Sequence, residues 1–178
     1  MNLLNKCRVY TVGHMQYANG EGWRNKIQEE FEKMEIVVFN PYTKPFVEKI
    51  EEGENTKLQL QTLIDNGQFE EAQNRMRKIR SYDLNLVDRS DFIVAHIIPN
   101  IASWGSAEEL VTAVRMKKPT FISIEGGKKS VPFWILGMFP EKYIYNSIDE
   151  IIEMVKKIDS GEKEMDSNRW RLLDKKYR

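Results

Sequence analysis

Cysteine and histidine are scarce in this chain of 178 residues, which has one cysteine, Cys7, and two histidines, His14 and His96. A single cysteine excludes an internal disulfide framework and suits a reducing compartment. Two isolated histidines and no cysteine cluster exclude a conventional zinc site, so we expect no bound metal. Because no base is near it in the sequence, Cys7 is predicted to be a small buried residue beside the first strand rather than a nucleophile.

Long apolar runs and an excess of charge are also missing. The longest apolar runs, 92–98 and 133–139, fall far short of the roughly 20 residues that span a bilayer, and the N-terminus lacks the apolar region of a signal peptide. Lys plus Arg equal Asp plus Glu at 27 each, so no overall field draws the chain to nucleic acid or anionic lipid. These absences predict a soluble, cytoplasmic protein with no membrane segment, and they argue against nucleic-acid binding.

Short β-branched or aromatic runs alternate with amphipathic helices along the chain. We predict strands at 8–13, 35–39, 92–98, 119–124 and 143–145, and helices at 21–34, 70–88, 107–114 and 147–158. The alternation predicts one α/β domain over 1–178, with a doubly wound parallel sheet of about five strands. Residues 42–80 are predicted to be a helical insertion after the second strand, serving as a lid or an interface, and 160–178 a C-terminal tail. A ligand should bind outside the carboxyl ends of the strands.

Asp83 interrupts an apolar helical stripe, four residues after Ile79 and four before Val87. A buried carboxylate is costly unless it is paired or functional, and this favours a functional role. The alternative is that the helix breaks there and Asp83 is solvated.

Two further acids, Glu108 and Glu109, follow the third predicted strand. Ser106 and Glu109 match a capping box, in which the glutamate would only close back on the Ser106 backbone. A helical wheel drawn through the apolar stripe of 107–114 puts Glu108 nearer its edge and Glu109 well off it. Periodicity therefore does not choose between a structural and a catalytic glutamate.

Other polar candidates cluster at the same predicted edge or on the insertion. His14 follows Gly13 at the end of the first strand and is a candidate ligand contact, whereas His96, inside a buried strand, is expected to be a satisfied core histidine. The basic residues of 75–80 are predicted to be a solvated helix face, with phosphate binding as the alternative. The apolar residues of 133–139 are expected in the core or at a subunit contact. No GxGxxG or GxxxxGK[ST] motif occurs.

Several short segments together resemble the nucleoside 2-deoxyribosyltransferase family, over about residues 8–125. They are Val9-Tyr10 through Gly13, Asn40-Pro41, Asp83-Leu84, Ser90 to Ala95, and Gly105 to Leu110. The resemblance implies a flavodoxin-like fold and cleavage of the N-glycosidic bond of 2′-deoxynucleosides, as in purine and pyrimidine salvage. It further implies that Glu109 is the nucleophile, that Asp83 assists protonation of the base and that Tyr10 orients Glu109.

The turns that follow the first and third predicted strands are expected to converge on the substrate, and the resemblance adds Asn40, a nucleoside ligand and an oligomer with shared sites. The predicted substrate-binding residues are Gly13, His14, Met15, Asn40, Ser103, Gly105 and Ser106. The expected partners are a nucleoside or nucleotide and a free nucleobase, with no cofactor and no metal. A homo-oligomer is expected, in which a C-terminal residue of a neighbouring subunit completes the site.

The leading functional hypothesis is transfer of 2-deoxyribose between nucleobases through a covalent glycosyl-Glu109 intermediate. A hydrolase acting on a nucleoside or its 5′-monophosphate is the nearest alternative, because Ser103 and Ser106 could serve a phosphate. A non-catalytic nucleotide sensor on the same fold is a third hypothesis. Direct nucleic-acid binding is the weakest, given the balanced charge.

Overall fold

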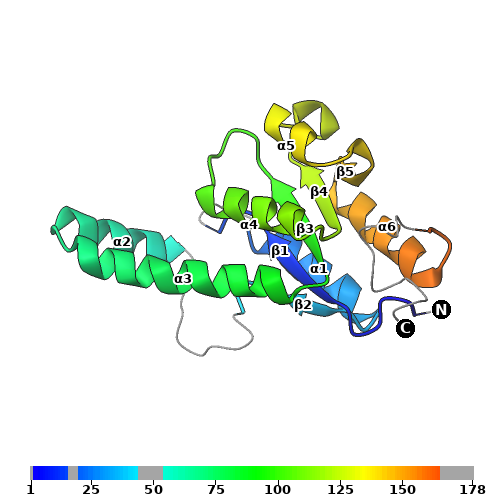
Figure 1. Ribbon diagram of the computed structural model, residues 1–178, viewed down its shortest axis with the longest axis horizontal. Helices are drawn as coiled ribbons and strands as arrows, with labels where there is room; N and C mark the ends of the chain where they lie inside the picture. The colour runs from blue at the N-terminus through cyan, green and yellow to red at the C-terminus, as the bar shows by residue number, and fades with distance from the viewer. Residues whose placement is uncertain (1, 16–19, 44–53, 165–178) are drawn as a thin grey trace.

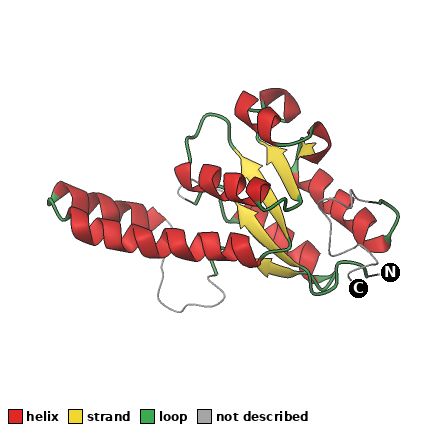
Figure 2. Cartoon of the chain, viewed as in Figure 1, coloured by secondary structure: helices red, strands yellow, loops and turns green. Residues whose placement is uncertain are grey.

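The computed structural model describes residues 2–15, 20–43 and 54–164, in which a parallel sheet is covered by helices on both faces (Figures 1 and 2). The strands are β1 (Arg8–Val12), β2 (Val37–Phe39), β3 (Phe92–Ile97), β4 (Thr120–Ile124) and β5 (Ile144–Tyr145). The helices are α1 (Gly22–Glu32), α2 (Glu54–Asp65), α3 (Phe69–Arg89), α4 (Trp104–Arg115), α5 (Phe133–Met138) and α6 (Ile148–Ser160). No helix among the described residues is long and apolar enough to cross a membrane.

The strand order is β2-β1-β3-β4-β5, and every pair is parallel. From β1 the chain first adds β2 on one side and later returns to add β3 on the other. In the register, Tyr10 lies opposite Phe39 on one side and Ile93 on the other. This arrangement confirms the predicted flavodoxin-like doubly wound sheet, with a crevice outside the carboxyl ends of β1 and β3 where the winding direction reverses.

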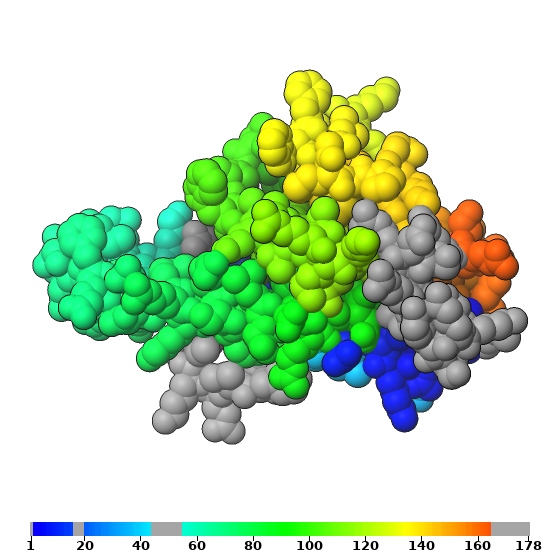
Figure 3. Space-filling model, viewed as in Figure 1, coloured from blue at the N-terminus to red at the C-terminus, as the bar shows by residue number. Residues whose placement is uncertain are grey.

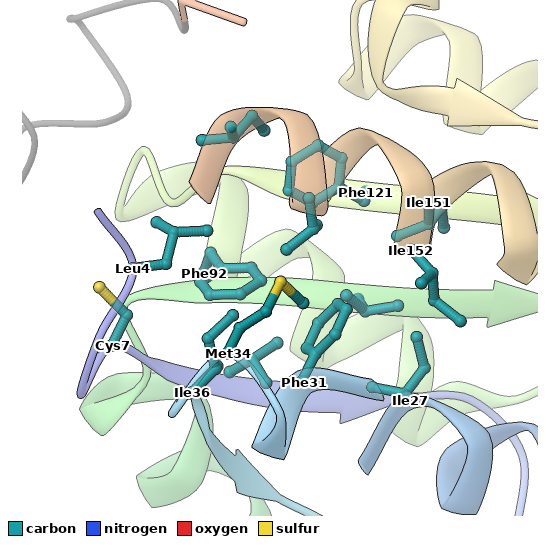
Figure 4. Packing of buried hydrophobic residues seen from close by; sticks show 14 of the residues in the cluster. Leu4, Cys7, Ile27, Phe31, Met34, Ile36, Phe92, Phe121, Ile151 and Ile152 are labelled. Atoms are coloured by element: carbon teal, nitrogen blue, oxygen red, sulfur yellow. The ribbon is translucent and has the colours of Figure 1, made fainter. Parts of the chain in front are cut away.

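One face of the sheet packs against α1 and α6, which also contact each other. Phe92 and Phe121 project from neighbouring strands at the centre of this layer, with their rings edge to face and 6.2 Å apart. Figure 4 shows Phe31 and Cys7 in the same cluster. Cys7 is 8% exposed, which confirms the prediction that it is a buried residue beside the first strand.

The opposite face packs against α3, α4 and α5. Its cluster includes Leu86 and Val87 of α3, Leu110 of α4 and Ile135 of α5. Because both faces are covered, the central strand β3 is apolar almost throughout, as expected for parallel sheets. The side chain of Tyr10 also belongs to this second cluster, and the functional candidates of α3 and α4 gather on this side.

The predicted helical insertion contains α2 and the first half of α3. Helix α3 has 21 residues and is therefore about 30 Å long. Its second half packs against α4 and β1, whereas its first half pairs with α2 and extends beyond the sheet as an arm (Figures 1 and 3). Residues 44–53 of the predicted insertion and 165–178 of the predicted tail lie outside the described residues.

Helix α6 begins with the cap that its sequence predicts. Ser147 is the N-cap, and its hydroxyl accepts a hydrogen bond from the Glu150 backbone N–H at 3.3 Å. The Glu150 carboxylate accepts from the backbone N–H of Asn146 at 2.9 Å, one residue before the predicted partner. The helix ends at Ser160 and is capped by Gly161, whose φ of 81° is a left-handed conformation suited to glycine.

Candidate active site

A pocket of about 440 Å³ opens at the carboxyl ends of β1 and β3, between the second half of α3 and the start of α4. All the predicted site residues except Asn40 line it. Those that do are Tyr10, Gly13, His14, Met15, Asp83, Ser103, Gly105, Ser106 and Glu109. The pocket therefore lies at the edge of the sheet where the fold predicts a ligand.

Glu109 is held by a hydrogen bond from Tyr10. The Tyr10 hydroxyl donates to the Glu109 Oε1 atom at 2.7 Å, and the two residues are only 1% and 8% exposed. The inward face of α4 carries Ser106, Glu109, Leu110 and Ala113, at the i, i+3, i+4 and i+7 spacing of one helical side. The sheet-facing side of α4 thus presents a carboxylate to the pocket rather than a continuous apolar stripe.

The start of α4 is set by Ser103. Its hydroxyl accepts a hydrogen bond from the Ser106 backbone N–H at 3.3 Å and donates to the Ser106 hydroxyl at 2.9 Å. Since Ser103 is the N-cap, the helix begins three residues earlier than a capping box at Ser106 requires. The alternative in which Glu109 only closes back on Ser106 is therefore wrong.

Glu108 points to a different partner. Arg80 of α3 donates to both of its carboxylate oxygens, with 2.7 Å between Nε and Oε2. These hydrogen bonds lower the pKa of Glu108 and raise that of Arg80. The structure thereby separates two adjacent acids that periodicity could not separate: Glu109 is buried against Tyr10, and Glu108 is engaged at the pocket rim.

Asp83 is half-buried and lines the pocket from α3. The helix runs without a break from Phe69 to Arg89, so the alternative in which it breaks at Asp83 is wrong. Ile79 and Leu84 lie beside Asp83 in the pocket wall. The pocket therefore has carboxylates on two walls, one from α3 and one from α4.

The turn after β1 requires glycine. A Cβ atom on Gly13 would lie 2.9 Å from the His96 carbonyl oxygen and 3.0 Å from a ring atom of Trp23. The next residue, His14, is buried, and its pKa is lowered by burial and then by the charge of Arg24. His14 is therefore a neutral imidazole in the pocket wall at pH 7.

Arg24 is a residue that the sequence analysis missed. It is fully buried, and its guanidinium donates to the Gly13 carbonyl at 2.7 Å and to the His14 carbonyl at 3.2 Å. Backbone carbonyls of the β1–α1 turn thus satisfy the buried cation and are held in place by it. Its spacing from Ile27 and Phe31, three and seven residues on, is the sequence signal that could have revealed its burial.

Asn40 was predicted to bind the substrate, but it does not line the pocket. It is fully buried, and its Oδ1 atom accepts from the Tyr42 backbone N–H at 3.0 Å, which makes an Asx turn at the end of β2. Pro41 lines the pocket instead. The Tyr42 hydroxyl donates to the Met15 carbonyl at 2.7 Å, so this turn braces the turn after β1.

The remaining polar candidates are accounted for structurally. His96 Nδ1 is 2.7 Å from the Ser123 hydroxyl and its Nε2 is 3.3 Å from Glu125, which confirms a satisfied core histidine. Within the basic cluster of 75–80, only Arg80 lines the pocket; Arg75, Arg77 and Lys78 are exposed, as predicted for a solvated face.

The apolar segment 133–139, which was expected in the core or at a subunit contact, is only partly in the core. In α5, Ile135 is buried but Phe133 and Trp134 are 91% and 80% exposed.

No group of three His, Cys, Asp or Glu side chains in residues 2–15, 20–43 and 54–164 is arranged to hold a metal ion. The described lining of the pocket offers carboxylates, a tyrosine, serines, a neutral imidazole and the Arg80 guanidinium.

No protein-family model matches the chain, and no curated protein matches it. Among solved structures, the 2-deoxyribosyltransferase of Bacillus psychrosaccharolyticus aligns with a TM-score of 0.57 at 13% identity, covering 82% of this chain and 90% of that one. A CMP N-glycosidase from Clostridium botulinum aligns with a TM-score of 0.47 at 15% identity, covering 84% and 98%. A 2-deoxyribosyltransferase from Leishmania mexicana gives 0.46 at 14% identity, covering 79% of each chain. At these identities the first likeness establishes a shared flavodoxin-like fold.

Proposed function

We propose that the protein transfers 2-deoxyribose between nucleobases by cleaving the N-glycosidic bond of a 2′-deoxynucleoside. The observation that carries the proposal is the buried 2.7 Å hydrogen bond from the Tyr10 hydroxyl to Glu109, in a pocket that Asp83 also lines. Bond cleavage at a sugar C1′ needs a carboxylate to stabilise or trap an oxocarbenium-like centre and an acid to protonate the leaving group. Glu109 and Asp83 are assigned these two roles.

In the first half-reaction, the Glu109 carboxylate attacks C1′ of the sugar and forms an ester bond to it. The C1′–N bond breaks, and its electron pair leaves with the base. Asp83 donates the proton that neutralises the departing base. Because Oε1 accepts the Tyr10 hydroxyl, Oε2 is assigned as the attacking atom, and Tyr10 is a positioning residue that sets the orientation of the carboxylate.

In the second half-reaction, a nitrogen of the acceptor base attacks C1′, and the ester bond to Glu109 breaks. The acceptor gives up its proton to the Asp83 carboxylate, which returns both acids to their starting states. The cycle balances without a redox step, since one N-glycosidic bond is broken and one is made.

The size and lining of the pocket suit such a substrate. Ligand sites commonly enclose about 300–1,000 Å³ and combine apolar walls with a few polar groups; this pocket has about 440 Å³. Met76, Ile79 and Ile101 supply apolar surface for a base, and Ser103 and Ser106 supply hydroxyls to the pocket that Glu109 also lines. The fold shared with a protein described as a 2-deoxyribosyltransferase gives the proposal additional support by analogy.

Chromatography of the purified protein with 2′-deoxyinosine, with and without adenine, tests the proposal. Transfer predicts that 2′-deoxyadenosine appears only when adenine is present and is lost in Glu109→Ala. Glu71→Ala is the matched control, because Glu71 is exposed on α3 and does not line the pocket. Hypoxanthine released at the same rate without adenine would instead indicate a hydrolase, and binding without any base release would indicate a sensor.

A further inference from the structure

Arg80 is the one cationic side chain among the described residues that line the pocket, since His14 is neutral at pH 7. The same lining contains the acids Asp83, Glu108 and Glu109. Even with Asp83 protonated, as the proposed proton transfer requires, two carboxylates face one guanidinium. The described pocket therefore has no positive charge in excess.

The Arg80 guanidinium is hydrogen-bonded to one of these acids, Glu108. Its Nε and Nη2 atoms each donate to a different oxygen of Glu108, across from α3 to α4. This parallel, two-point arrangement uses the donors with which an arginine grips a phosphate. A phosphate that binds Arg80 through the same two donors would have to displace Glu108 and leave that carboxylate next to its own negative charge.

We propose that Glu108 is a specificity-determining residue, which occupies Arg80 and so makes the pocket accept an uncharged 2′-deoxynucleoside and reject the corresponding 5′-monophosphate. This inference rests on the proposed function, because it names the substrate class of the same site. A phosphate ester carries about −1.5 to −2 charge at pH 7, and like charges in a partly desolvated site repel strongly.

The pair is not deeply buried, and this sets the expected size of the effect. The Arg80 and Glu108 side chains are 58% and 39% exposed, so water and salt weaken the repulsion. We expect the wild-type protein to favour 2′-deoxyinosine over its 5′-monophosphate by about 100-fold in kcat/KM at low ionic strength. The preference should shrink as salt is added.

The test compares 2′-deoxyinosine with 2′-deoxyinosine 5′-monophosphate, each with adenine as acceptor, in the wild type and three variants. Glu108→Gln keeps the size of the side chain but removes its charge, which leaves Arg80 available to a phosphate. The ratio of the two kcat/KM values should shift toward the monophosphate by about 10-fold or more. Arg80→Gln combined with Glu108→Gln should lose this gain, and Glu71→Gln should leave the ratio at its wild-type value.

Calorimetric titration of both compounds, with the same four proteins, separates the failure of this inference from the failure of the proposed function. Binding of 2′-deoxyinosine in preference to its monophosphate, without turnover, would refute deoxyribosyl transfer and support the role of Glu108. Equal use or equal binding of the two compounds by the wild type would overturn the role of Glu108. An unchanged ratio in Glu108→Gln, or binding of neither compound, would overturn it as well.

Discussion

The Tyr10 hydroxyl donates a 2.7 Å hydrogen bond to Glu109 across 99 residues of sequence. Tyr10 comes from β1 and Glu109 from α4, which follows β3, so the contact spans the point where the winding of the sheet reverses. Arg24 holds the adjoining turn through the carbonyls of Gly13 and His14. The fold thus places an oriented carboxylate in a pocket, and the buried Arg24 guanidinium holds the Gly13 and His14 backbone that lines the same pocket.

Replacing Tyr10 with Phe removes the donor but keeps the ring. A hydrogen bond to a charged group is worth about 1.5–3 kcal/mol, so we expect kcat to fall by about 10- to 100-fold, with a smaller change in KM. Steady-state kinetics with 2′-deoxyinosine and adenine would measure this. A Tyr10→Phe protein that folds normally and retains wild-type kcat would show that Tyr10 does not orient the nucleophile.

Replacing Asp83 with Asn removes the proposed proton donor. With 2′-deoxyinosine we expect the rate to fall by about 100- to 10,000-fold. With 7-methyl-2′-deoxyguanosine, whose base is already cationic and leaves without protonation, the loss should be about 10-fold or less. Equal losses with the two substrates would argue against acid catalysis by Asp83, and Asp88→Asn, at an exposed site on the same helix, is the matched control.

Gly105 offers a probe of the pocket that does not disturb the fold. A Cβ atom placed there meets nothing within 4 Å, and the residue lines the pocket in the first turn of α4. Gly105→Ala should therefore keep or slightly raise thermal stability, while the added methyl group raises KM by about 10-fold or more. Gly137→Ala on α5 also meets nothing within 4 Å and lies outside the pocket, so its KM should not change.

The two histidines give a pH prediction. Burial is the main cause that lowers the pKa of both His14 and His96 below the ordinary value of 6.5. The unfolded chain therefore takes up protons at these sites before the folded protein does, and stability should fall as pH drops below about 6.5. Proton NMR of the two imidazole resonances should give midpoints below 6.5, and a midpoint at or above that value for His14 would contradict its neutral state in the pocket.

Much of the fold was predictable because the signals are local. The apolar run of β3, bounded by the polar end of α3 and a turn, is typical of a strand covered on both faces. The apolar stripe of α3 and the Ser147 N-cap of α6 were also predictable, because each depends on residues a few positions apart in the sequence. The reciprocal hydrogen bond of α6 differs in its position, because it falls on Asn146 rather than Ser147.

The orientation of α4 was not predictable by the same means. Its apolar stripe suggested that Ala107 and Val111 face inward, but both are exposed, while Ser106 and Glu109 are buried. The inward face is polar because it borders a pocket, and a periodicity argument assumes an apolar core. Asn40 was assigned to the substrate from a resemblance in short segments, and such a resemblance does not reveal that its amide oxygen accepts a hydrogen bond within its own turn.

The proposed mechanism requires a covalent bond between Glu109 and the sugar. The direct measurement is mass spectrometry of the protein after mixing with 2′-deoxyinosine in the absence of acceptor and quenching in acid, followed by peptide mapping. We expect a mass increase of one deoxyribosyl group, located on Glu109, which disappears when adenine is added before the quench and does not form in Glu109→Gln. Transfer of deoxyribose to adenine with no adduct at any time, or an adduct on another residue, would contradict it.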